Sequence, residues 1–155
     1  MQLNRQWIAA HIPHQGAMCL LDEVLDWSAS EIRCRTRSHC LADNPLRTGE
    51  RLRALCGIEY AAQAIAVHGA LITEAGGNAP RPGMLAGVRN VELEVERLDD
   101  INADLIVRGV RLGGDSTALL YGFSLSWDLR ELVAGRATIL LRAPAAIPAG
   151  ATRPR

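Results

Sequence analysis

Residues 53–71 read RALCGIEYAAQAIAVHGAL, and this stretch decides how the rest of the chain folds. It is long enough for about five turns of α-helix at ~3.6 residues per turn. The residues are apolar almost all the way round the helix, with alanine at six of the positions. We therefore expect a helix that is buried inside its domain.

The polar residues of this helix are the informative exceptions. Glu59 and Gln63 lie four residues apart and share one face, whereas His68 lies nine residues after Glu59 and points the other way. A carboxylate on a buried helix must be paired, protonated or functional. We therefore take Glu59 as the first candidate functional residue, Gln63 as a hydrogen-bond partner of Glu59 or of the loop, and His68 as a packing or interface residue.

The composition limits the classes of protein that need to be considered. The 155 residues suit one domain, and with 48% apolar and 22% charged residues the chain resembles an ordinary globular protein. A net charge of zero with no basic patch argues against nucleic acid as a partner. No apolar run has the length of a membrane span, and the N-terminus lacks the pattern of a signal peptide. The four cysteines are scattered without a C-x-x-C pair, so we expect a cytoplasmic protein without disulfides or a metal.

The segments around the helix predict an antiparallel sheet. Alternating residues predict two strands before the helix and three or four after it, joined mostly by short turns. The predicted elements are a short helix at 3–10, strands at 19–27 and 31–38, a long loop at 39–52, and strands at 84–98, 103–112, 117–128 and 131–142. The Pro- and Ala-rich residues 143–155 predict a disordered C-terminal tail.

This order of elements predicts an α+β fold in which one helix lies across a curled antiparallel sheet of five or six strands. We expect residues 1–142 to form a single domain. Such a fold has only one sheet layer, so two subunits that pair sheet edge to sheet edge would shelter the helix and its carboxylate.

Three segments resemble one known family in the right order. These are IPHQGAMCLLDEV at 12–24, GIEYAAQA at 57–64 and MLAGVRNVEL at 84–93. They resemble the 3-hydroxyacyl-[acyl-carrier-protein] dehydratases of hotdog fold, and within them the predicted dehydratases of bacterial aryl polyene clusters. The resemblance implies a dimeric enzyme without a cofactor that removes water from a 3-hydroxyacyl thioester carried by acyl carrier protein, giving the trans-2-enoyl form.

The resemblance also implies roles for single residues. In the family a loop histidine takes the proton at C2, a helix carboxylate helps the hydroxyl to leave, and backbone N–H groups at the helix start polarise the thioester carbonyl. Glu59 stands at the position of the carboxylate and Gln63 at that of the glutamine that follows it. Gly57 stands near the helix start, and Gly87 would allow the backbone to approach the ligand or a neighbouring strand closely.

The chain departs from the family at the loop histidine, whose position falls at about Pro45 here. Two histidines are candidates for the base, His39 in the loop and His14 beside Pro13, and a partner subunit could instead supply its own. We expect an acidic carrier protein to bind beside three arginines near the helix start, Arg47, Arg51 and Arg53. Two other functions stay open: an acyl thioesterase of the same fold, and a catalytically incomplete partner subunit of a dehydratase heterodimer.

Overall fold

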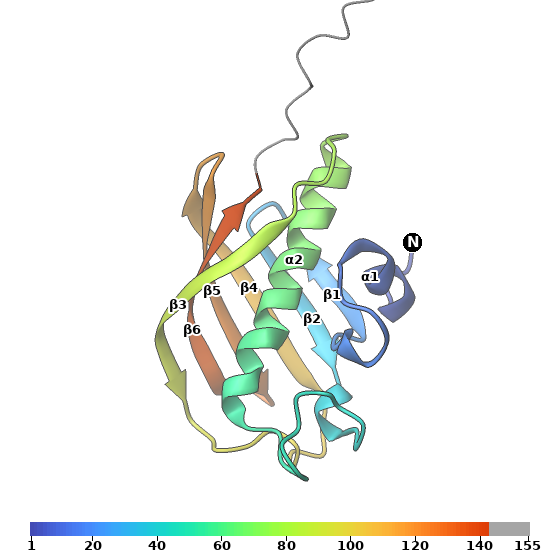
Figure 1. Ribbon diagram of the computed structural model, residues 1–155, viewed down its shortest axis with the longest axis vertical. Helices are drawn as coiled ribbons and strands as arrows, with labels where there is room; N and C mark the ends of the chain where they lie inside the picture. The colour runs from blue at the N-terminus through green and yellow to red at the C-terminus, as the bar shows by residue number, and fades with distance from the viewer. Residues whose placement is uncertain (143–155) are drawn as a thin grey trace, which may run out of the picture.

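A computed structural model describes residues 1–142 and shows one long helix lying across a curved antiparallel sheet of six strands (Figure 1). This is the predicted α+β hotdog arrangement. The tail predicted at 143–155 lies outside the described residues.

Residues 1–142 contain two α-helices, a long one that lies across the sheet and a short one that packs against the long one. Helix α1 spans Arg5–His11 and begins at Asn4, whose side-chain oxygen accepts the N–H of Trp7. The central helix α2 spans Gly57–Ala75 and continues directly from a 3₁₀ turn at Ala54–Cys56. The long apolar stretch of the sequence therefore forms the predicted central helix.

The sheet confirms most of the predicted strands but not all of the predicted neighbours. The strands are β1 Glu23–Trp27, β2 Glu31–Thr36, β3 Gly83–Leu93, β4 Leu105–Gly114, β5 Ala118–Trp127 and β6 Arg130–Leu141. Their order across the sheet is β1-β2-β4-β5-β6-β3, with every pair antiparallel. The expected short turns join β4, β5 and β6. Strand β3 instead pairs with β6, because α2 carries the chain across to the far edge of the sheet (Figure 1).

The predicted strand at 19–27 is too long, because Cys19–Asp22 lies outside the sheet ladder. Leu20 and Leu21 are fully buried. The backbone N–H of Leu20 donates to the side chain of Gln63, and its carbonyl accepts the hydroxyls of Thr36 and Ser38. Side chains rather than a neighbouring strand therefore pair with the backbone groups of Leu20, and Gln63 fixes this residue against α2.

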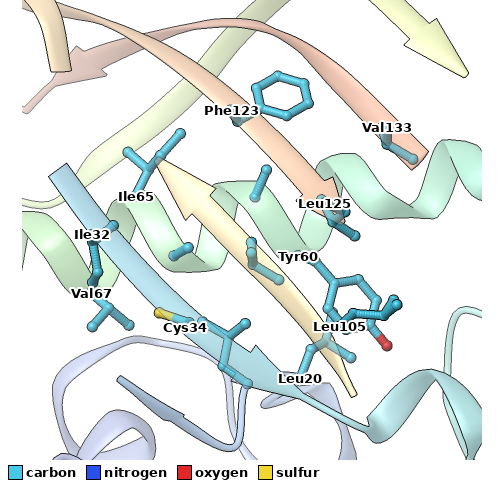
Figure 2. Packing of buried hydrophobic residues seen from close by; sticks show 14 of the residues in the cluster. Leu20, Ile32, Cys34, Tyr60, Ile65, Val67, Leu105, Phe123, Leu125 and Val133 are labelled. Atoms are coloured by element: carbon cyan, nitrogen blue, oxygen red, sulfur yellow. The ribbon is translucent and has the colours of Figure 1, made fainter. Parts of the chain in front are cut away.

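The core lies between one side of α2 and the concave face of the sheet (Figure 2). The helix contributes Tyr60, Ile65 and Val67, which pack among buried residues of β2, β4, β5 and β6. Those labelled in Figure 2 are Ile32, Cys34, Leu105, Phe123, Leu125 and Val133. The expectation that no apolar run has the length of a membrane span is wrong, because the helical stretch Ala54–Ala75 is long and apolar enough to cross a membrane by length and composition. Half of its 18-residue apolar window is buried inside the protein, as in core helices of globular proteins.

The prediction that α2 is buried on every face is wrong. Its second face carries Glu59, Ala62, Ala66 and Ala70, all of which are only partly buried. The three alanine side chains are too short to fill the space towards β3, which is itself exposed along nearly its whole length. The face that carries the carboxylate therefore borders a cavity.

Candidate functional site

An apolar cavity of about 370 Å³ lies between the second face of α2 and the strands β3, β5 and β6. One wall consists of small helix residues and the other of larger strand side chains. The lining residues are His11, Pro13, His14, Glu59, Ala62, Ile65, Ala66, Gly69, Ala70, Thr73, Pro80, Arg81, Pro82, Gly83, Leu85, Leu119, Tyr121, Ile139 and Leu141. A cavity with such walls and few polar groups suits a hydrocarbon chain with a reacting group at a fixed point.

That fixed point is a histidine–carboxylate pair. The imidazole Nε2 of His14 lies 3.1 Å from Oε1 of Glu59, and the two side chains are 28% and 33% exposed. The Nδ1 atom of His14 is shielded from solvent and has no hydrogen-bond partner among residues 1–142. When Nε2 carries the proton and donates it to the carboxylate, Nδ1 has a free lone pair that can accept a proton. The pair therefore combines a base with an acid.

Gln63 fixes the segment that carries His14. Its side chain is fully buried, and its Oε1 accepts the backbone N–H of Leu20 at 2.9 Å. Its Nε2 donates to the carbonyl of Met18 at 2.7 Å and to Oε1 of Glu59 at 3.4 Å. The predicted bond to Glu59 is confirmed, and Gln63 also ties Glu59 to the chain that follows His14. Gln63 is not among the residues that line the cavity.

The structure does not bring His39 to Glu59. His39 is fully buried in the loop, and its Nε2 donates to the carbonyl of Ile101 at 2.9 Å. Burial lowers the pKa of His39. A second contact fixes the same loop, because the side-chain amide of Asn44 donates to the hydroxyl of Tyr60 at 2.9 Å. His39 is therefore buried and hydrogen-bonded away from Glu59, so we do not retain it as a candidate base.

The two glycines proposed for substrate binding lie outside the reacting end of the cavity. Gly57 is buried, and a Cβ there would lie 3.2 Å from side chains of Leu125 and Val133. Its N–H already donates to the carbonyl of Ala54 in the 3₁₀ turn, so it cannot polarise a thioester. A Cβ at Gly87 would meet nothing within 4 Å, so no close approach inside this chain requires a glycine there. Both roles lack support from the geometry.

A buried pair borders the cavity, and its tyrosine was not singled out from the sequence. Tyr121 lines the cavity, and its hydroxyl lies 2.8 Å from Nδ1 of His68. His68 is fully buried, as expected for a packing residue. The signal for Tyr121 was its place among inward-facing residues of a strand, but a pattern of alternation does not distinguish a cavity wall from a core residue.

The cysteines show no sign of nucleophilic or metal chemistry. Burial raises the pKa of the Cys34 thiol to about 12 and also raises the pKa of Cys56, which stands at the helix start. Within residues 1–142, no group of three or more His, Cys, Asp or Glu side chains is placed to hold a metal ion.

Comparison with known proteins points to one family. The family model described as ApeP-like, ApeP dehydratase, matches residues 6–145. A search of the curated proteins finds no match. Among solved structures, the dehydratase heterocomplex ApeI:P from Xenorhabdus doucetiae matches with a TM-score of 0.79 at 24% identity, covering 88% of this chain and 91% of the other.

Thioesterases share the fold at lower similarity. A thioesterase from Haemophilus influenzae matches with a TM-score of 0.58 at 8% identity, over 77% of each chain. A mutant thioesterase from Pseudomonas aeruginosa matches with a TM-score of 0.56 at 11% identity, over 77% of this chain and 79% of the other. At these identities the likeness shows the fold alone.

Proposed function

The chain belongs to the ApeP-like dehydratase family, and from this premise we propose that it dehydrates 3-hydroxyacyl thioesters carried by acyl carrier protein to trans-2-enoyl thioesters. The observation that carries the proposal is the 3.1 Å contact between His14 and Glu59 at the edge of an apolar cavity. We further propose that the reaction belongs to polyene or fatty-acid biosynthesis in the cytoplasm.

The pair supplies both proton transfers that dehydration needs. His14 takes the proton from C2 of the substrate, and the electron pair of that C–H bond forms the C2–C3 double bond. Glu59, protonated beforehand, gives its proton to the departing hydroxyl, so that water leaves with the electrons of the C3–O bond. The contact between Nε2 and Oε1 then lets the imidazolium pass its Nε2 proton to the carboxylate, and exchange of the remaining ring proton from Nδ1 to Nε2 through water restores the starting tautomer.

A second hotdog subunit belongs to this proposal. Strand β3 is a free edge with apolar side chains in the open, among them Met84 at 64% and Leu93 at 45% exposure. An exposed apolar strand edge favours pairing with another chain. The ApeI:P match is itself a complex of two dehydratase subunits. We therefore propose a homodimer or a heterodimer, in which the partner could supply the loop histidine that this chain lacks.

Exposed arginines next to the start of α2 are the candidates for contact with the carrier protein. Arg51 and Arg53 are exposed next to the start of α2, as a surface for an acidic carrier requires. Arg47 has a different role, because its guanidinium donates to the carbonyls of His39 and Glu50 within the loop. Only Arg51 and Arg53 therefore remain candidates for contact with the carrier.

The test is dehydration of a 3-hydroxyacyl-carrier thioester, followed by the ultraviolet absorbance of the enoyl product. We expect Glu59→Gln and His14→Gln each to lower kcat by about 10²-fold or more. Glu74→Gln is the matched control, because Glu74 lies on the same helix 3.6 Å from another histidine, His11, and should retain activity.

The same assay separates the alternatives. Each protein is measured alone and mixed with a hotdog dehydratase subunit, and free thiol is measured in parallel. Activity only in the mixture that still depends on Glu59 would identify a partner subunit that contributes its carboxylate. Release of thiol without enoyl product would identify a thioesterase. Full activity of Glu59→Gln in both settings would refute the proposed site.

A further inference from the structure

The cavity is long and follows the axis of α2. Its helix wall runs from Glu59 to Thr73, which corresponds to roughly 21 Å at 1.5 Å per residue. Along this wall the side chains are small, with alanine at 62, 66 and 70 and glycine at 69. A long cavity that starts at a catalytic pair holds an extended chain beyond the reacting carbons.

Gly69 opens the middle of the helix wall. An added Cβ at this position would meet no atom within 4 Å. Gly57, on the same helix, would instead bring its Cβ to 3.2 Å from two buried side chains. The missing side chain at Gly69 therefore leaves free space in the cavity instead of allowing close packing.

Tyr121 belongs to the strand side of the cavity, and a buried histidine holds it in place. Nε2 of His68 lies 2.7 Å from the carbonyl of Ser28, which can only accept a hydrogen bond, so Nε2 carries the proton. Nδ1 of the neutral ring must then accept the hydroxyl of Tyr121 at 2.8 Å. The two rings stand at 88° with centroids 5.7 Å apart.

This arrangement makes Tyr121 a wall and not an acid or base. Its hydroxyl is occupied by the hydrogen bond to His68, so Tyr121 contributes its apolar ring to the cavity lining. Burial raises the pKa of Tyr121 to about 12, and the hydroxyl stays neutral at physiological pH. Because a hydrogen bond and core packing fix the ring, it cannot swing aside without leaving buried polar atoms unpaired.

We propose that Gly69 and Tyr121 set the width of the cavity and thereby select a slim, unbranched acyl chain over one that is branched at this depth. The inference rests on the proposed function for the identity of the ligand as an acyl thioester. Selection by width follows from packing, since even one extra methylene group in an apolar pocket changes binding about tenfold or more.

The experiment measures binding by isothermal titration calorimetry, with saturated acyl-pantetheine thioesters that cannot be dehydrated. A straight chain is compared with chains of the same length that carry a methyl branch at mid-chain, and with a short chain that ends before Gly69. The protein is used in the assembly in which it purifies. The wild type should prefer the straight chain to the branched one by about tenfold.

Two variants should change the affinity for long chains in opposite directions. Tyr121→Ala should bind the branched chain about tenfold more tightly than the wild type does, whereas Gly69→Val should weaken the long straight chain about tenfold and spare the short one. Phe123→Ala is the matched control, because Phe123 is a buried aromatic residue on the same strand but does not line the cavity. The preference of Phe123→Ala for the straight chain over the branched one should equal that of the wild type.

Gly69→Val keeps the test decisive even if Tyr121→Ala does not fold, since the valine projects into free space. Equal weakening of short and long chains in Gly69→Val, or no change in either, would overturn the width proposal. Because binding of unreactive thioesters does not require turnover, this result stands apart from the dehydratase assay. If the enzyme dehydrates its substrate but shows no selection by width, the width proposal is refuted and the proposed function stands.

Discussion

Replacing Gln63 with leucine tests how the helix holds the segment that carries His14. The substitution removes the partners of two shielded backbone groups, the N–H of Leu20 and the carbonyl of Met18. Leaving such a group unpaired costs about 1–3 kcal/mol each, and the apolar side chain recovers part of this sum. We expect a net loss of about 3 kcal/mol in the free energy of unfolding.

That loss is measurable by thermal and urea unfolding. At about 2–4 °C per kcal/mol for a domain of this size, the midpoint of thermal unfolding should fall by roughly 6–12 °C. The free energy itself comes from urea denaturation. Amide hydrogen exchange should increase in residues 14–20 more than in the sheet, and turnover should fall because His14 is held less firmly beside Glu59.

Gln15→Leu is the matched control for this prediction. Gln15 also donates to backbone carbonyls, those of Ala9 and Ile12, but its side chain is exposed and water can replace it. It should change stability by less than about 0.5 kcal/mol. If Gln63→Leu were as stable as Gln15→Leu, or if exchange rose equally everywhere, the reasoning about this anchor would be refuted.

Three further predictions concern titration and packing. Burial lowers the pKa of His68 from its ordinary 6.5. The free energy of unfolding therefore has its full value above pH 6.5 and falls as the pH drops below it. His68→Gln should make the urea midpoint less dependent on pH over this range. A hydrogen bond from Arg97 lowers the pKa of Asp99 from 3.8 to about 2. The resulting stability of about 2 kcal/mol should be present above pH 4, decline towards pH 2, and be lost at neutral pH in Asp99→Asn. Gly69→Ala should stabilise the protein by up to about 1 kcal/mol, whereas Gly57→Ala should destabilise it by about 1 kcal/mol through overpacking; equal shifts in both variants would contradict the contacts at these sites.

The fold was largely predictable because it depends on local patterns. The apolar stretch after Arg53 and the alternating strands specify one helix and one sheet, which the structure confirms. The pairing of β3 with β6 was not predictable from these patterns, since it depends on where α2 ends after crossing the sheet. The length of the strand after Cys19 was also wrong, because Gln63, forty-three residues from Leu20, takes the N–H that a strand neighbour would have bonded.

The site was predictable in part. Glu59 was found because a carboxylate on an apolar helix demands an explanation, and Gln63 because residues four apart on a helix share a face. The choice between His14 and His39 required the structure, since both stand in irregular segments without periodicity. His39 lies in the core, and only His14 contacts Glu59.

The sequence by itself determined the helix, the strands and the presence of one carboxylate on an otherwise apolar helix, because these follow from the spacing of residues along the chain. Only the tertiary structure decided which histidine meets that carboxylate, which face of α2 is left open, and that Tyr121 is a wall of the resulting cavity. The physical reason is that a hydrogen bond or a cavity depends on distances between atoms from distant segments, and packing of the whole chain sets those distances.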